Sequence, residues 1–182
     1  MRLRRSAIAG IALAAAASLT LAACGGGSDD GGSDKTDAVI TAYGTEPQNP
    51  LITTNTNEVG GGNIIDLIYA GLVNYKADGS QELEVAESIE SDDNKVWTIK
   101  LKDWKFSDGT DVTAKSFADA WNYGANGANA QLQAYFFSTF AGTDDEGIIV
   151  DKGTEMSGVK VVDDKTLEVT LKAPEALFPL RL

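Results

Sequence analysis

Histidine is absent from the 182 residues, and cysteine occurs once, at position 24. The missing histidine excludes a Ser-His-Asp triad, a Cys–His pair and a histidine-ligated zinc ion within this chain. Because Cys24 has no second cysteine to pair with, a disulfide scaffold and a multi-cysteine metal site are excluded too. A mechanism that uses carboxylates alone, or a Ser–Lys pair, is the catalytic chemistry that the composition leaves open.

Basic residues are also scarce, with 15 Lys and Arg against 27 Asp and Glu, for a formal net charge of −12. Three of the basic residues are Arg2, Arg4 and Arg5, so removal of the first 23 residues would leave 12 against 27 and a net charge of about −15. A surface of that sign repels phosphate, so nucleic acid is not an expected partner.

Long apolar runs are limited to one, residues 7–23, which are rich in alanine and follow the three arginines. A basic head, a short apolar body and small residues at its end are typical of an export signal. The body is short for a membrane span, and no basic cluster follows it. The residues LAAC, ending at Cys24, resemble the bacterial lipobox, which implies acylation of Cys24 and cleavage just before it. We therefore interpret 1–23 as a lipoprotein signal peptide; a retained helix, or a plain signal peptide with an incidental thiol, are the alternatives.

Residues 25–37 (GGGSDDGGSDKTD) contain no apolar side chain. Such a composition cannot bury enough surface to order itself. We predict a flexible tether over 24–37, which would let a folded body stand off a membrane.

Ordered sequence is expected from about residue 38. Residues 39–43 have the composition of a strand, and two prolines break the pattern in 44–51. Residues 53–62 are polar, end in three glycines and predict a loop. Asn63 can then cap a helix with an apolar face made by Ile64, Leu67, Ile68 and Leu72.

The clearest pattern is KVWTIKLK at 95–102, where Trp97, Ile99 and Leu101 alternate with polar residues. It predicts a half-buried antiparallel strand. The alternation changes phase at Asp103, and a bulge or bend there would bring Trp104 and Phe106 into the core.

Three further segments complete the expected fold. Thr113 is a good N-cap for a helix over about 114–123, with Phe117, Ala120 and Trp121 on one face. Residues 135–140 form an aromatic cluster, for which core packing and ligand contact are both open. Residues 159–171 alternate on either side of an acidic turn and predict a hairpin. Together these elements predict an α+β fold with antiparallel strands and helices on one side.

Several of these motifs, in this order, resemble the extracytoplasmic oligopeptide/dipeptide-binding proteins of ABC importers. They are NIIDLIYAGLVNYKADG, VAES, KVWTIKLK, FSDGTDVTAKSFADAWN and GVKVVDDKTLEVTLKAPEALF. The sequence departs from the family pattern at Asn49, Ile89 and Ser116, where aspartate, tryptophan and aspartate are common. These departures affect the fit of the pattern and bear on specificity.

The resemblance implies the amino-terminal part of a longer, two-lobed, periplasmic-binding-protein-like fold with mixed and antiparallel sheets. Residues 38–68 would supply the first strand and helix of the main lobe, and 69–182 a smaller subdomain of the same lobe, truncated. The second lobe would be absent, which agrees with the strongly apolar residues 177–182, since natural termini are usually polar or tied down.

The resemblance also implies function. It identifies a monomeric receptor without cofactor, metal or catalytic step, which binds peptides and hands them to an ABC permease. By their place in the pattern, Thr54, Asn55 and Thr56 would offer backbone groups to a peptide, and Tyr135 would approach it. Nickel complexes, oligosaccharides or other small solutes are the alternative ligands. A secreted lipoprotein hydrolase or a surface scaffold is the alternative of a different class. The receptor would lie at the outer face of the cytoplasmic membrane, held there by the lipid on Cys24.

Overall fold

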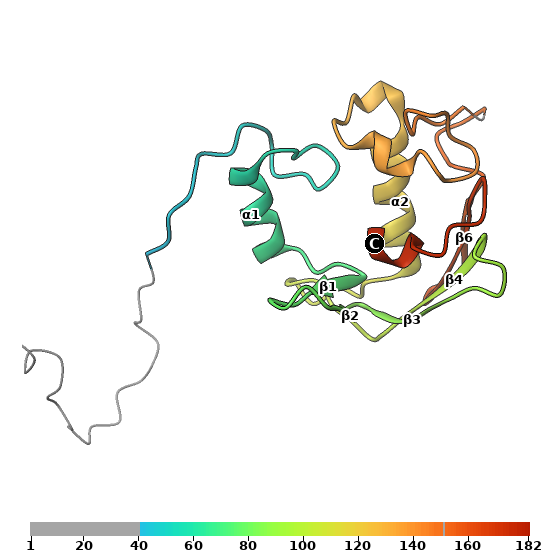
Figure 1. Cartoon of the computed structure of the whole chain (residues 1–182), viewed down its shortest axis with the longest axis horizontal. Helices are drawn as coiled ribbons and strands as arrows, with labels where there is room; N and C mark the ends of the chain where they lie inside the picture. Colours follow the sequence, from blue (N-terminus) through green and yellow to red (C-terminus); the bar gives the residue numbers. More distant parts are fainter. Residues whose placement is uncertain (1–40, 151) are drawn as a thin grey trace, which may run out of the picture. The chain divides into compact units, whose positions relative to one another are not determined.

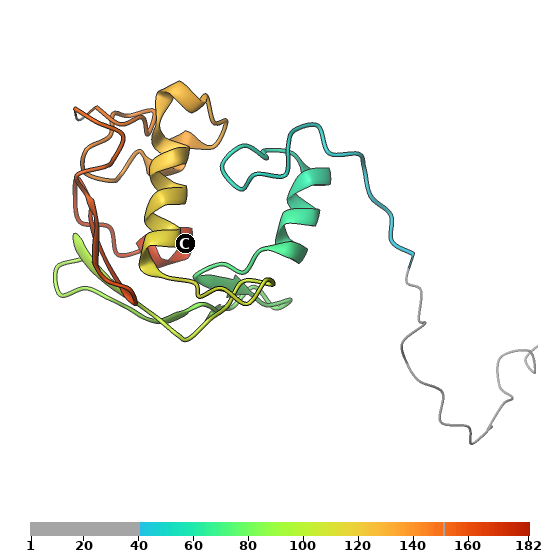
Figure 2. The same cartoon turned by 180° about the vertical axis from the view of Figure 1, so that it is seen from behind.

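Antiparallel strands and a covering helix make up the region that carries the period-two patterns. A computed structural model describes residues 41–150 and 152–182, and its folded unit runs from Tyr43 to Leu182 (Figures 1 and 2). The helices are α1 (Val59–Ile68), α2 (Ala114–Ala125) and the 3₁₀ helices η2 (Gly127–Asn129), η3 (Ala134–Phe137) and η4 (Phe178–Arg181). The strands are β1 (Val73–Tyr75), β2 (Gln81–Leu83), β3 (Ala86–Glu90), β4 (Val96–Leu101), β5 (Val159–Asp163) and β6 (Thr166–Thr170). The predicted α+β class is confirmed.

The four-stranded sheet has the order β3-β4-β6-β5 and is antiparallel throughout, while β1 and β2 form a separate two-stranded sheet. In the central pair, Trp97 lies opposite Val169 and Ile99 opposite Leu167. All four side chains are buried, together with Leu101. The strand and the hairpin that the alternation predicted are therefore confirmed. The apolar sides of β4 and β6 form one face of the core, whereas Val161 of β5 is exposed.

A chain of aromatic rings fills the space above this face. The ring centroid of Phe178 lies 5.6 Å from that of Trp97 and 5.6 Å from that of Phe140, and Phe140 in turn contacts Phe137 and Trp121. Phe178 is only 1% exposed. Phe178 is thus part of the core, whereas its apolar neighbours Leu177 and Leu180 are exposed. Each fully buried ring contributes about 1.5–3 kcal/mol through burial.

Helix α2 begins after its predicted N-cap, Thr113. The backbone N–H of Thr113 donates to Ser116 Oγ at 3.2 Å. Ser116 therefore satisfies a backbone donor at the helix start, a task that a carboxylate can also perform. Of the predicted apolar face, Phe117 and Trp121 pack against the core, whereas Ala120 is exposed.

Helix α1 begins earlier than predicted. Its N-cap is Glu58, whose carboxylate accepts a hydrogen bond from Gly61 N at 2.9 Å, and not Asn63. A Cβ atom on Gly60 would lie 2.6 Å from the carbonyl oxygen of Thr45. The glycines are thus helical residues, and Gly60 lets a neighbouring segment approach closely, a tertiary contact that outweighs its low helix propensity.

The predicted apolar face of this helix is not buried within the described residues. Leu67 and Ile68 are 85% and 60% exposed, and Leu72 is buried but lies beyond the helix end at Ile68. The prediction of one continuous helical face from Ile64 to Leu72 is therefore wrong.

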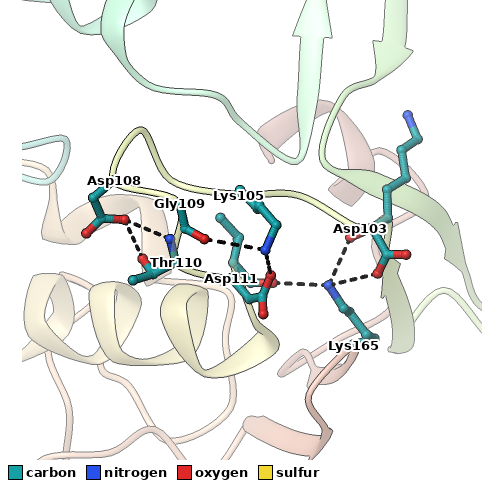
Figure 3. A network of polar contacts seen from close by, with 9 residues as sticks. Asp103, Lys105, Asp108, Gly109, Thr110, Asp111 and Lys165 are labelled. Atoms are coloured by element: carbon teal, nitrogen blue, oxygen red, sulfur yellow. Dashed lines mark hydrogen bonds and ion pairs between the residues drawn. The ribbon is translucent and has the colours of Figure 1, made fainter.

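Residues 102–112 form a hairpin that does not continue β4, with Lys105 opposite Asp111. Figure 3 shows its polar contacts: Asp108 accepts from Thr110, and Lys165 Nζ lies 3.4 Å from Asp103 Oδ1. Trp104 packs against the core, whereas Phe106 is 49% exposed. The prediction that a bulge would bury both rings is wrong for Phe106, because its backbone pairs with Thr110 at the turn.

Some predicted features lie outside the described residues. They are the signal peptide 1–23, Cys24, the tether to residue 37 and the first residues of the strand predicted at 39–43. Residues 41–43 are described and belong to no strand.

Candidate functional site

The loop 50–57 is folded by its own hydrogen bonds. The Pro50 carbonyl accepts from Ile52 N at 2.7 Å and from Thr56 Oγ at 3.0 Å. The Ile52 carbonyl accepts from the backbone N–H groups of Asn55 and Thr56, each at 2.9 Å. These contacts close two successive turns, so the loop has a defined shape despite its polar sequence.

Thr54 attaches this loop to helix α2. It is buried, and a Cβ atom on Gly124 would lie 2.5 Å from Thr54 Cγ2 and 2.8 Å from Phe137 Cε2. Only glycine at position 124 leaves room for the threonine methyl group between the helix and the Phe137 ring.

Two glutamines complete the attachment from the segment 131–137. Thr54 Oγ donates to Gln131 Oε1 at 3.0 Å. Gln133 donates twice, from its backbone N–H to the Thr54 carbonyl at 2.9 Å and from Nε2 to the Thr56 carbonyl at 2.7 Å. Thus three hydrogen bonds link parts of the chain 77 or more residues apart.

Tyr135 and Phe136 follow Gln133 after one residue, Ala134, and lie in η3. Their rings are stacked, with centroids 4.7 Å apart and an interplanar angle of 29°. They remain 54% and 45% exposed, whereas Phe137 and Phe140 are buried. The aromatic cluster therefore divides into two core rings and an exposed, stacked pair beside the loop 50–57.

The back of η3 is held by two other parts of the chain. Thr143 Oγ donates to the Phe137 carbonyl at 2.9 Å, and Gly147 packs against the Ala134 carbonyl so closely that a Cβ atom there would overlap it. Arg181 donates to the Phe136 carbonyl at 2.8 Å and to Thr139 Oγ at 3.0 Å. The aromatic pair is thus presented from a rigid support.

The four predicted ligand residues lie in this one region. However, the carbonyls of Thr54 and Thr56 and the N–H groups of Asn55 and Thr56 are used within the protein. Among hydrogen bonds between described residues, the Thr54 N–H, the Asn55 carbonyl and the Asn55 side chain take no part. Among the predicted residues 54–56, these are the polar groups that the described protein leaves without a hydrogen bond.

The sequence reasoning missed Gln131 and Gln133. They lie in a glycine- and asparagine-rich stretch without periodicity, and their partners are about 77 positions away. No local pattern signals such a contact.

The one titratable group of altered pKa next to the loop is Glu58. The hydrogen bond from Gly61 N–H, above all, lowers the pKa of its carboxyl group. Among the described residues, no three His, Cys, Asp or Glu side chains are grouped as metal ligands, and no helix has the length and hydropathy of a membrane span.

The structure defines an α+β unit that presents a polar loop and an exposed aromatic pair. The chain matches the family model described as bacterial extracellular solute-binding proteins, family 5 Middle, over residues 81–182. It belongs to this family of solute-binding proteins.

Relatives support the assignment. The chain is 40% identical to the periplasmic oligopeptide-binding protein OppA of Escherichia coli over 121 residues, which are 64% of this chain and 22% of that protein. It is 34% identical to the oligopeptide-binding protein OppA of Bacillus subtilis over 169 residues, 88% of this chain and 30% of that protein. The chain thus spans roughly a quarter of the length of these relatives.

Solved structures share its fold. The murein tripeptide-binding protein MppA of Escherichia coli superposes with a TM-score of 0.66 at 30% identity, over 75% of this chain and 27% of that one. The peptide-bound OppA of Listeria monocytogenes gives 0.62 at 34% identity, over 69% and 25%. The predicted relation to periplasmic-binding-protein-like folds is confirmed.

Proposed function

We propose that this chain forms the amino-terminal part of a lipid-anchored receptor that binds peptides outside the cytoplasmic membrane and delivers them to an ABC permease. The observation that carries the proposal is the fold shared, over about seven tenths of this chain, with an OppA that was solved bound to peptide. The names of the curated relatives, which are oligopeptide-binding proteins, support the same ligand class.

In this proposal, 38–68 belong to the main lobe and 69–182 to the smaller subdomain beside it. The second lobe is supplied by sequence outside this chain. The exposed Leu67 and Ile68 of α1 support this division, because apolar side chains on a helix face are usually buried by another element. The receptor works as a monomer, and peptide binding favours the closed arrangement of its lobes.

Binding of varied peptides requires contacts to the peptide backbone, which do not depend on side chains. The free Thr54 N–H and Asn55 carbonyl supply one donor and one acceptor for such contacts. The exposed Tyr135 ring supplies apolar surface beside them. The mechanism needs no catalytic group, and no step of it uses a metal or a cofactor.

The test is a thermal-shift screen of the longest chain that the gene encodes, without its signal peptide. Peptides, an oligosaccharide series and a nickel chelate are compared at increasing concentration. A peptide at 100 times its Kd should stabilise the protein by about 2.7 kcal/mol. No shift with any peptide, together with a shift with a sugar or the chelate, would overturn the peptide assignment.

The anchor is tested separately by metabolic labelling with a fatty-acid analogue. Wild-type protein should carry the label and sediment with membranes, because two acyl chains anchor stably where one is marginal. Cys24→Ser should abolish both. Equal labelling of wild type and variant would refute the lipidation of Cys24.

A further inference from the structure

We infer that Gln133 is a positioning residue for ligand binding: its side-chain amide holds the loop 50–57 in its binding conformation. The inference rests on the proposed function. It adds a residue that need not touch the ligand and that controls the shape of the loop that does.

Gln133 is the point at which the two halves of the candidate site meet. Its backbone N–H and its Nε2 donate to the carbonyls of Thr54 and Thr56, on either side of Asn55. One side chain and its own backbone thus fix two peptide units that flank the residue with free polar groups. Its carbonyl also accepts from Phe136 N at 3.1 Å, so the same residue is tied to the aromatic pair.

The other end of the amide shows that this side chain is not optimal for stability. Gln133 Oε1 is buried and accepts no hydrogen bond from any described residue. A buried acceptor without a partner is unfavourable, and an apolar side chain of similar length would avoid that cost. The benefit of the amide therefore lies in what Nε2 does, which is to orient the Thr56 carbonyl.

Orientation of that carbonyl matters because the loop has few bonds to the rest of the protein. Within the loop, the turns around Ile52 define its local shape. Its placement depends on the bonds of Thr54 and Thr56 to the two glutamines. At its edges, Tyr69 Oη donates to the Leu51 carbonyl at 3.3 Å and Asn49 Nδ2 donates to Asn57 Oδ1 at 3.2 Å. Without the Gln133 amide the loop would sample other placements. The apparent Kd would then equal the intrinsic Kd divided by the fraction of molecules whose loop is in the binding placement. If that fraction is one tenth, the ligand binds about tenfold more weakly.

The test is Gln133→Met in the longest encoded chain, with Gln81→Met as its matched control. Gln81 Nε2 also donates to a backbone carbonyl, that of Pro179, at 2.8 Å, and lies outside the loop and η3. We expect Gln133→Met to raise the Kd for a bound peptide about tenfold. The Tm should stay within about 4 °C of wild type, because the substitution also removes the unpartnered Oε1. Gln81→Met should leave the Kd unchanged.

A second readout needs no ligand. Hydrogen exchange of the Asn55 and Thr56 amides should be faster in Gln133→Met than in wild type, since these N–H groups form the inner turn of the loop. Faster exchange in a protein that binds no peptide would support the positioning of the loop while refuting the proposed function.

An unchanged Kd in Gln133→Met would overturn the inference, and so would an equal rise in Kd in both methionine variants. If Gln133→Met does not fold, Gln131→Met decides. It removes the side-chain link to Thr54 Oγ and, besides that, a local bond from Nε2 to the Asn129 carbonyl at 2.7 Å. Gln131→Met should also raise the Kd, by a smaller factor than that expected for Gln133→Met. An unchanged Kd in Gln131→Met would overturn the inference.

Discussion

The losses of unfolding free energy in Gly147→Ala and Gly109→Ala, taken together, separate backbone strain from steric overlap where Gly147 packs against η3. Both glycines have a left-handed backbone, with φ of 82° at Gly147 and 89° at Gly109. A side chain in that conformation costs roughly 1–2 kcal/mol at either position. A Cβ atom at 109 would meet nothing within 4 Å, so Gly109→Ala should cost only this strain.

At position 147 the added Cβ would overlap the Ala134 carbonyl oxygen and lie 2.7 Å from its carbon and 3.1 Å from Ser138 N. These are backbone atoms of η3 and its cap, so no side chain can rotate away. Overpacking of this kind adds about 1–3 kcal/mol, for a total loss of about 2–5 kcal/mol. Because the displaced backbone leads directly into Tyr135, ligand affinity should fall as well.

The assay is urea unfolding of the purified variants, followed by the fluorescence of the three tryptophans. Gly109→Ala serves as the control for the strain common to both. Equal losses of unfolding free energy in the two variants would refute the reasoning, since they would mean that the Ala134 carbonyl does not contact position 147.

Three other changes have defined outcomes. Phe178→Ala should lower the unfolding free energy by about 3–5 kcal/mol in the same urea assay, because its ring packs between those of Trp97 and Phe140. A loss below about 1 kcal/mol would contradict its place in the core. The hydrogen bond from Val96 N–H, above all, holds the pKa of Asp93 below its ordinary value of 3.8. The contribution of Asp93 to folding stability is therefore present above pH 4 and is lost as the pH falls through the lowered pKa. Asp93→Asn should therefore show a smaller drop in Tm between pH 6 and pH 3 than wild type, and an identical drop would exclude this role. Lys165→Met removes an ion pair to the exposed Asp103 and two long hydrogen bonds, to the carbonyls of Lys102 and Val112. It should change stability by less than about 1 kcal/mol. A larger loss by urea unfolding would mean that the network in Figure 3 contributes more than its exposure indicates.

Elements with a strong local pattern could be predicted from the chain alone. β4 and β6 show strict alternation, and α2 has its cap at Thr113. In each case the signal lies within a few residues of the element that it describes, because side-chain direction repeats every two or 3.6 positions. The turns at Asp78 and Asp108 also rest on local contacts, since each carboxylate accepts from a backbone N–H two residues on.

Two predictions failed, one because of a distant contact and one because of a local turn. The glycines at 60–62 were predicted to be part of a loop, yet they are helical: the backbone of Thr45 packs against Gly60, and Glu58 caps the helix. Phe106 was predicted to be a core residue, but its backbone forms hydrogen bonds within a tight hairpin.

The sequence alone established the composition limits, the acidic charge, the motif order that resembles peptide-binding proteins and the residues from which the candidate site was drawn. The tertiary structure decided which polar groups of these site residues remain without a partner. The carbonyls of Thr54 and Thr56 accept hydrogen bonds from Gln133, which lies 77 positions beyond Thr56. Hydrogen bonds between segments so far apart depend on the packing of α2 against the sheet and of η3 against Gly147. Periodicity and propensity act over a few residues, and they carry no information about such contacts.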